Sequence, residues 1–152
     1  MSQHRIAVLS DTHNHLPEKV LHQLQSADSI WHLGDVVRPS VLDPIRLLGK
    51  NFVLVRGNCD TEFDWPLTRS LVFGKTIFQL IHIPPDYFFA NPDENKVLLH
   101  GHLHTPRDEI VNGVRVLSPG AISQPRAGSS PSFAWLDVEE NGDFTWRLIE
   151  TN

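Results

Sequence analysis

Apolar residues in the first third of the chain predict strands that alternate with helices. Short apolar runs at residues 5–10, 29–33 and 51–55 are typical of buried strands. Between them, residues 17–26 and 41–48 place apolar side chains at helical spacing. Since strands that alternate with helices usually pair in parallel, this part of the chain favours a parallel arrangement.

The rest of the chain shows pairs of short strands around tight turns. The turns are Gly74-Lys75, Asn112-Gly113 and Asn141-Gly142, and the strands expected around them are 71–73 and 76–81, 110–111 and 114–117, and 134–138 and 144–149. Asn-Gly favours the type I′ turn of a hairpin, which needs positive φ at both central residues. Together the two patterns predict mixed α and β structure, with two packed sheets and helices outside them.

Length and composition indicate one soluble domain spanning residues 1–152. The chain has 40% hydrophobic residues, enough for a core, and its single cysteine, Cys59, excludes an internal disulfide. No apolar stretch approaches the roughly 20 residues that cross a bilayer, and the polar start lacks the hydrophobic run of a signal peptide. We therefore expect a cytoplasmic protein without membrane association; homo-oligomerisation stays open.

The net charge of the chain limits the partners that it can bind. A formal charge of -5, without a basic run, disfavours bulk nucleic-acid binding. A small phosphorylated substrate remains compatible, because bound divalent cations can be the largest local charges in a site.

Metal-capable side chains follow the apolar runs directly, where buried strands would reach the rim of a sheet. They are Asp11, His13, Asp35, Asn58, His82, His102 and His104. Asp11 and His13 are two residues apart, as are His102 and His104, so in extended backbone each pair projects to one side. Each pair could chelate one ion.

The donor set suits a catalytic metal centre. Carboxylate, imidazole and amide ligands fit Mn²⁺, Fe²⁺, Zn²⁺ or Ni²⁺, and the thiolates of a closed structural zinc site are missing from the set. Seven candidate ligands are too many for one tetrahedral ion but natural for two ions about 3.5–4 Å apart that share a carboxylate.

The ordered motifs resemble those of the calcineurin-like metallophosphoesterase superfamily, most closely its small bacterial phosphodiesterase branch. They are Asp11-Thr12-His13, Gly34-Asp35, Gly57-Asn58-Cys59-Asp60, His82 and Gly101-His102-Leu103-His104. The resemblance implies an α/β, four-layer αββα sandwich in which two mixed sheets are flanked by helices. It also implies that Asp11, His13, Asp35 and His104 hold one metal, that Asp35, Asn58, His82 and His102 hold the other, and that Asp35 bridges them.

The expected activity is metal-dependent hydrolysis of a phosphoester, with preference for a phosphodiester and Mn²⁺ as the leading metal. A water that bridges two ions would be acidified to hydroxide and attack phosphorus in line. Asn58 would bind metal and orient a phosphoryl oxygen, and Asp60 would fix nearby geometry.

Two residues depart from the family pattern. Cys59 stands where many larger members have a histidine that protonates the leaving group, so the proton donor is unassigned, and two nearby cations would lower the pKa of its thiol. Ile83 stands where the family has glycine after the histidine, and its bulk would lie beside the second metal.

Two other functions compete with the phosphoesterase. A binding scaffold would resemble the retromer subunit that keeps this fold while losing catalytic histidines, but His13, His82, His102 and His104 are present here. A dinuclear amidohydrolase would share the ligand types, whereas the Asp-x-His start and the Gly-Asn-Cys-Asp segment favour phosphate esters.

Overall fold

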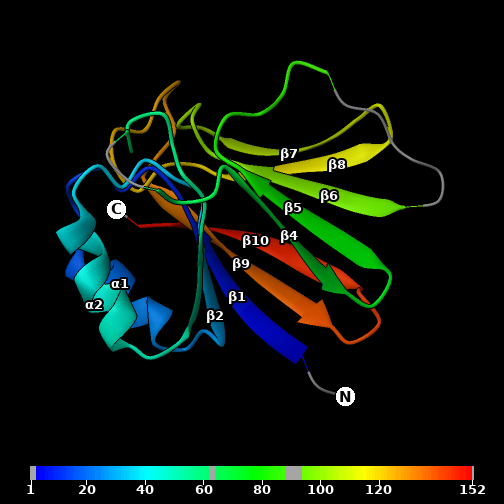
Figure 1. Cartoon of the computed structure of the whole chain (residues 1–152), viewed down its shortest axis with the longest axis horizontal. Coiled ribbons are helices and arrows are strands. Elements are labelled where there is room, and N and C mark those ends of the chain that lie inside the picture. Colours follow the sequence, from blue (N-terminus) through cyan, green and yellow to red (C-terminus); the bar gives the residue numbers. More distant parts are fainter. Residues whose placement is uncertain (1–2, 62–63, 88–93, 152) are drawn as a thin grey trace.

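Two five-stranded sheets pack face to face in the computed structural model, which describes residues 3–61, 64–87 and 94–151 (Figure 1). The first sheet has the order β10-β9-β1-β2-β3, with β1 (Gln3–Leu9), β2 (Ser29–His32), β3 (Asn51–Leu54), β9 (Ser132–Glu139) and β10 (Phe144–Glu150). The second has the order β4-β5-β6-β8-β7, with β4 (Thr68–Phe73), β5 (Thr76–Ile81), β6 (Asn95–His100), β7 (Pro106–Val111) and β8 (Val114–Pro119).

Both sheets are mixed, as expected. β1 pairs in parallel with β2, and β2 with β3, which confirms the parallel arrangement predicted for the first third. β5, β6 and β8 are also parallel, whereas β4–β5, β7–β8 and β9–β10 are antiparallel hairpins around the three predicted turns.

The two Asn-Gly turns differ from each other. Asn112 and Gly113 have φ of 51° and 82°, as a type I′ turn requires. Gly142 has φ of 97°, but Asn141 is not among the positive-φ residues, so the type I′ expectation is wrong there. The Asn141 side chain instead accepts a hydrogen bond from the Asp143 N–H at 2.9 Å, which shapes a longer turn.

The helices lie on the outer face of the first sheet. α1 (Glu18–Leu24) begins after Pro17, and the expected helix at 41–48 is divided into the 3-10 helix η1 (Pro39–Leu42) and α2 (Asp43–Leu47). Pro44 in the first turn of α2 has no N–H to donate to the preceding turn, which explains the break. Val20, Leu24 and Ile45 pack in one cluster with Ala7 and Leu9 of β1.

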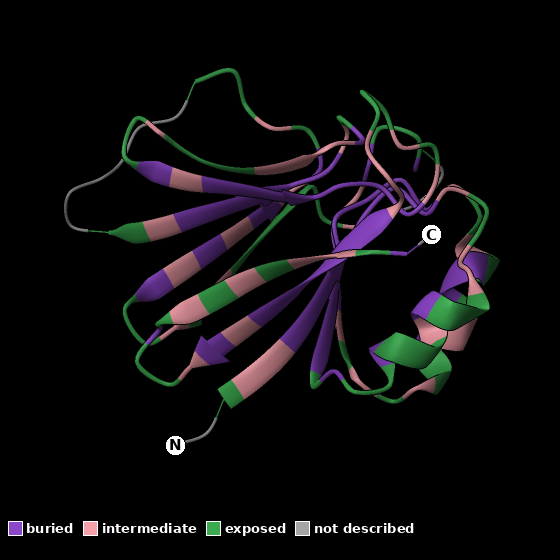
Figure 2. Cartoon of the chain, turned by 180° about the vertical axis from the view of Figure 1, so that it is seen from behind, coloured by how far each residue is buried: buried purple, intermediate pink, exposed green. Residues whose placement is uncertain are grey.

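The main core fills the space between the sheets. Ile6, Val8 and Trp31 of the first sheet pack against Phe78 and Leu80 of the second, and all five are at most 1% exposed. Figure 2 shows this burial along the central strands, with more exposed positions at the outer strands. The alternation of side chains along each strand therefore gives the first sheet two buried faces.

The opposite face of the second sheet carries a smaller apolar cluster, formed by Leu98, Val114 and Val116. β5 and β6 are joined by residues 82–94, and within the described ranges no helix follows α2. The predicted α/β sandwich of two mixed sheets with helices is confirmed, and its described helices cover the first sheet. No helix in these ranges is long and apolar enough to span a bilayer.

Candidate metal centre

All seven predicted ligands lie at one end of the sandwich. They follow β1, β2, β3, β5 and β6, and the parallel strands of each sheet end at the same edge. A hydrogen bond of 2.8 Å between His82 Nδ1 and the Leu33 carbonyl joins the two edges. The sheet topology thus brings together residues that are up to 93 positions apart in the chain, from Asp11 to His104.

Four residues form what we call the first ligand group: Asp11, His13, Asp35 and His104. One potential ligand atom from each lies within 4.8 Å of all the others. Asp11, Asp35 and His104 are buried, at 0%, 3% and 3% exposed. Their positions match the requirements of a single cation held by two carboxylates and two imidazoles.

The second ligand group shares Asp35 with the first and adds Asn58, His82 and His102. His82 Nε2 lies 3.3 Å from Asp35 Oδ2 and 3.8 Å from Asp11 Oδ1. His102 Nδ1 lies 3.0 Å from Asn58 Oδ1, and the His82 and His102 rings have centroids 5.3 Å apart. These contacts link His102 to Asn58 and place its ring beside that of His82.

Three buried ligand atoms in these groups lack a hydrogen-bond partner among the described residues: Asp11 Oδ1, His13 Nε2 and His82 Nε2. His104 Nε2 is 3.2 Å from Asp11 Oδ1, but the contact lacks hydrogen-bond geometry. Buried polar atoms are almost always paired, so a cluster of three needs an explanation. Divalent cations would satisfy all three, and the residues present fit them.

The remaining atoms of these side chains are held by the protein. Asp11 Oδ2 accepts hydrogen bonds from Ser10 Oγ at 2.7 Å and from the His102 N–H at 3.2 Å. His104 Nδ1 pairs with the Gln124 carbonyl at 2.8 Å, as His82 Nδ1 does with Leu33. A carbonyl can only accept, so each ring carries its proton on Nδ1 and turns the Nε2 lone pair toward the site.

Backbone strain concentrates at the ligands. Positive φ is uncommon for residues other than glycine, yet five of the seven predicted ligands adopt it. The values are 55° for Asp11, 49° for His13, 62° for Asp35, 76° for His102 and 61° for His104. The fold holds these residues in an unfavourable conformation in order to direct their side chains inward.

Two glycines permit close packing around the carboxylates. A Cβ on Gly57 would overlap Asp35 Oδ1, and a Cβ on Gly101 would overlap Ser10 Oγ. The Cβ on Gly57 would also meet the Asp35 backbone nitrogen, and the Cβ on Gly101 would lie 2.9 Å from Asp11 Oδ2, so both would crowd a predicted ligand. Both positions therefore require glycine.

Asp60 organises the loops that carry the second ligand group. Its buried carboxylate accepts hydrogen bonds from the N–H groups of Asp35, Val36, Val37 and Gly57, at 2.8–2.9 Å. One of these donors, Val37, has φ of 65°, a rare conformation for a β-branched residue. These contacts are what the expected geometry-fixing role of Asp60 requires.

Cys59 contributes through its backbone. Its N–H donates to Asp35 Oδ1 at 2.9 Å, while the side chain is exposed. Partial desolvation of the sulfur by the surrounding protein, followed by the charge of Asp35, raises the pKa of the Cys59 thiol. The protein's own groups thus oppose the lowering that was expected from two cations.

The carboxylate of Asp35 and the imidazole of His82 shift each other's pKa. Burial acts to raise the pKa of Asp35, but neighbouring His82 and the Cys59 N–H outweigh it and hold the pKa below its ordinary value. Burial acts to lower the pKa of His82, but Asp35 and Asp11 outweigh it and raise the pKa. A cation at this point would replace the proton of His82.

His32 and His100 act as hydrogen-bonding residues inside the fold. His32 accepts from the Gly34 N–H at 3.0 Å and pairs with Thr12 Oγ1 at 3.0 Å. Complete burial is the main cause that lowers the pKa of His32 to about 3, and burial likewise lowers that of His100 to about 4. Both imidazoles are therefore neutral at neutral pH.

Ile83 does not displace His82, although its bulk was expected to disturb the second metal position. His82 keeps its contacts with Leu33 and Asp35, and Ile83 is 46% exposed. Ile83 lines a pocket beside the site instead. Sequence reasoning missed this pocket and the supporting roles of Ser10 and Gln124, because carbonyl and hydroxyl contacts across the fold leave no motif.

Comparison with known proteins decides the family. The sequence profile of the calcineurin-like phosphoesterase superfamily domain matches residues 5–141. The chain belongs to this superfamily. A relative named as a probable metallophosphoesterase of Methanocaldococcus jannaschii is 31% identical over 151 residues, which cover 89% of this chain and 76% of the relative.

Other superfamily members and structures are similar over most of the chain. Phosphodiesterase YfcE of Escherichia coli is 28% identical over 161 residues, covering 88% of this chain and 87% of YfcE. Its structure has a TM-score of 0.71 at 22% identity, covering 97% of this chain and 100% of that one. The zinc complex of Vps29 from Entamoeba histolytica has a TM-score of 0.73 at 18% identity, covering 97% and 99%, which shows the fold alone.

Proposed function

We propose that this calcineurin-like protein is a metal-dependent phosphodiesterase with two divalent cations, of which Mn²⁺ is the leading candidate. The observation that supports it most strongly is the convergence of Asp11 Oδ1, His13 Nε2 and His82 Nε2, three buried atoms without partners in the described structure. The name of YfcE as a phosphodiesterase supports the substrate class.

The residues divide the work between two cation positions. The first ligand group would hold one ion and the second ligand group the other, with Asp35 shared. When bound, two divalent cations supply a water of lowered pKa and positive charge for the phosphoryl oxygens. Asp35 Oδ1 is already engaged by the Cys59 N–H, which fixes the carboxylate that both positions use.

Two other residues, Asn58 and Asp60, would orient the substrate and position the loops. The exposed amide of Asn58 lies at the open side of the second ligand group, where it can also contact a phosphoryl oxygen. Asp60 acts through the backbone of the loops, since its carboxylate accepts hydrogen bonds from four main-chain N–H groups. No described side chain is assigned as proton donor, so esters with good leaving groups are the appropriate first substrates.

The test is metal-restored hydrolysis of aryl phosphates. Metal-stripped protein is assayed with bis(p-nitrophenyl) phosphate and p-nitrophenyl phosphate after addition of Mn²⁺, Ni²⁺, Zn²⁺ or no metal. We expect metal-dependent turnover with faster hydrolysis of the diester. Asp35→Asn should lose about a thousandfold or more, since it weakens both ions, each worth several kcal/mol to the reaction.

Asp43→Asn is the matched control, because Asp43 is an exposed carboxylate in the first turn of α2. It should retain wild-type activity. Equal activity of Asp35→Asn and the wild type would refute the shared position, and hydrolysis of carboxylic amides without phosphoesters would favour an amidohydrolase.

A binding scaffold is the second candidate, supported by the likeness of the fold to Vps29. The orphaned ligand atoms favour the enzyme, because a scaffold gains nothing from strained, inward-facing histidines. Stoichiometric metal binding without turnover of any phosphoester would favour the binding scaffold over the enzyme.

A further inference from the structure

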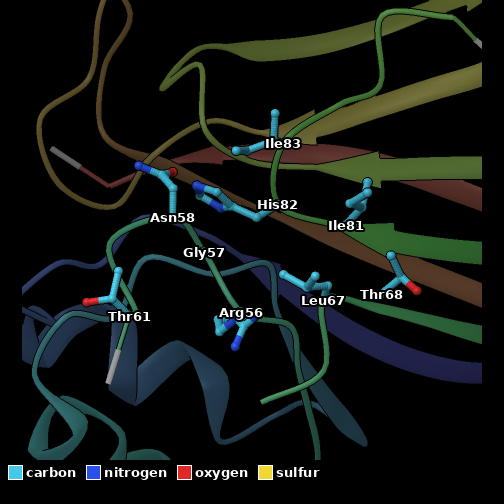
Figure 3. Close-up of a pocket in the computed structure, with 9 residues that line it drawn as sticks. All are labelled: Arg56, Gly57, Asn58, Thr61, Leu67, Thr68, Ile81, His82 and Ile83. Atoms are coloured by element: carbon cyan, nitrogen blue, oxygen red, sulfur yellow. The ribbon is translucent and has the colours of Figure 1, made fainter. Parts of the chain in front are cut away.

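A pocket of about 510 Å³ adjoins the second ligand group (Figure 3). It lies where the end of β3 faces β4 and the end of β5, at the edge strands β3 and β4 of the two sheets. Asn58 and His82 belong both to the pocket wall and to the second ligand group. A group that is attached to a phosphate held by these residues can therefore extend directly into the pocket.

The wall of the pocket is mainly apolar on one side. Leu67, Ile81 and Ile83 lie on this side, and Leu67 and Ile83 are 57% and 46% exposed. Single exposed apolar residues are common, but apolar side chains gathered beside a polar site are typical of ligand pockets. Their placement beside His82 indicates that the pocket binds an apolar group.

A few polar groups complete the wall. Thr61 and Thr68 supply hydroxyls, Arg56 supplies a positive charge, and no carboxylate is among the described lining residues. A hydrogen bond of 2.8 Å from the Arg56 N–H to the Pro66 carbonyl joins the two backbone segments that carry Arg56 and Leu67. The described part of the wall therefore lacks the carboxylates of the first ligand group.

We propose that this pocket binds one ester group of the phosphodiester and selects an aromatic or similarly large, mainly apolar group over a small alkyl group. Ile83 and Leu67 are the specificity-determining residues. The inference rests on the proposed function for the position of the phosphate, and it assigns a role to the residue that replaces the glycine of the family pattern.

Binding of two stable phosphonates to the metal-loaded protein tests the pocket. Phenylphosphonate and methylphosphonate carry the same anionic group and differ only in the attached group, so calorimetry measures the preference of the pocket without any turnover. Wild-type protein should bind phenylphosphonate on the order of tenfold more tightly, as expected for burial of several apolar carbons. Ile83→Asn and Leu67→Asn should each reduce this preference to about threefold or less.

Two control variants distinguish an effect on the pocket from a general effect of substitution on the fold. Ile83→Leu restores apolar bulk and should restore the preference, and Leu47→Asn changes a leucine of α2 that is 87% exposed and should leave it unchanged. A wild-type protein without preference, or the same preference in both pocket variants, overturns the inference.

Hydrolysis of bis(p-nitrophenyl) phosphate and methyl p-nitrophenyl phosphate is measured in parallel. Turnover of both diesters with a rate ratio that Ile83→Asn and Leu67→Asn leave unchanged overturns the pocket while supporting the phosphodiesterase. Absence of turnover together with an Ile83-dependent preference for phenylphosphonate overturns the phosphodiesterase while supporting the pocket.

Discussion

The two ligand groups share Asp35 but differ in how far they are buried. In the first ligand group Asp11, Asp35 and His104 are at most 3% exposed, and His13 is half-buried. The second group shares Asp35 and has His82 at 2% exposed and His102 half-buried, but its Asn58 is exposed and lines a pocket. From the exposed Asn58 and the pocket we infer that the second group would face a substrate, whereas the first would mainly hold a cation.

The sharpest way to test this asymmetry is to remove one histidine from each group. His104→Ala should weaken the tighter Mn²⁺ by more than about 100-fold, because even supporting residues of metal sites are worth 10–100-fold. His102→Ala should weaken the other Mn²⁺ by roughly tenfold, since that group is already open to water. Calorimetric titration of metal-stripped protein measures both affinities.

His22→Ala is the matched control, since His22 is exposed on α1. It should change neither affinity. Equal losses in His102→Ala and His104→Ala would remove the distinction between the two groups.

Asp60 holds the loop of Asp35 to the loop of Asn58, so its loss should affect stability as well as the second ligand group. Asp60→Ala leaves four backbone N–H groups without their acceptor and should lower the free energy of unfolding by roughly 3–5 kcal/mol. Urea unfolding measures this change. A loss near that of the exposed control Asp43→Ala would contradict the role.

The first ligand group also depends on a neutral His32, which forms hydrogen bonds with Thr12 Oγ1 and the Gly34 N–H. Its pKa falls from 6.5 to about 3 on folding, so only the unfolded chain binds this proton between those values. Stability should therefore decrease as the pH falls through that window, by roughly 2–3 kcal/mol from this residue at pH 4.5.

Unfolding curves at pH 7 and pH 4.5 test this dependence against His32→Gln, which keeps an N–H donor and cannot take up a proton. The variant should lose much of the pH dependence. The same slope in both proteins would show that other groups, such as His100, cause it.

The smallest effect is expected at Cys59, at the open side. Its N–H contacts Asp35 while its thiol is exposed, so Cys59→Ala should change the hydrolysis rate by less than about threefold, within the usual range for a surface substitution. Steady-state assays with bis(p-nitrophenyl) phosphate measure the rate. A much larger loss would assign the thiol a part in proton transfer.

The strand-end motifs predicted which residues would meet, because parallel strands bring their carboxyl ends to one edge. Asp11 and Asp35 could be placed together for that reason, whereas His104 follows a strand of the second sheet and meets them only because the two sheets stack. The sequence did not reveal their positive φ values or the Gln124 contact that orients His104, since both depend on loops that pack across the fold.

The same limit applies to Ile83 and to the helix around Pro44. A departure from the family pattern suggested a disturbed metal position, but the strand end directs the Ile83 side chain to a pocket that only the packing of two sheets creates. The apolar spacing predicted one helix at 41–48, and the missing N–H of Pro44 divides it.

Turnover during stepwise addition of Mn²⁺ to metal-stripped protein tests the central claim most directly. Bound metal and the hydrolysis of bis(p-nitrophenyl) phosphate are measured at each step. If two ions share Asp35 and act together, activity should rise mainly with the second bound equivalent and reach its plateau at two. Full activity at one equivalent, or no hydrolysis with two bound, would contradict the account.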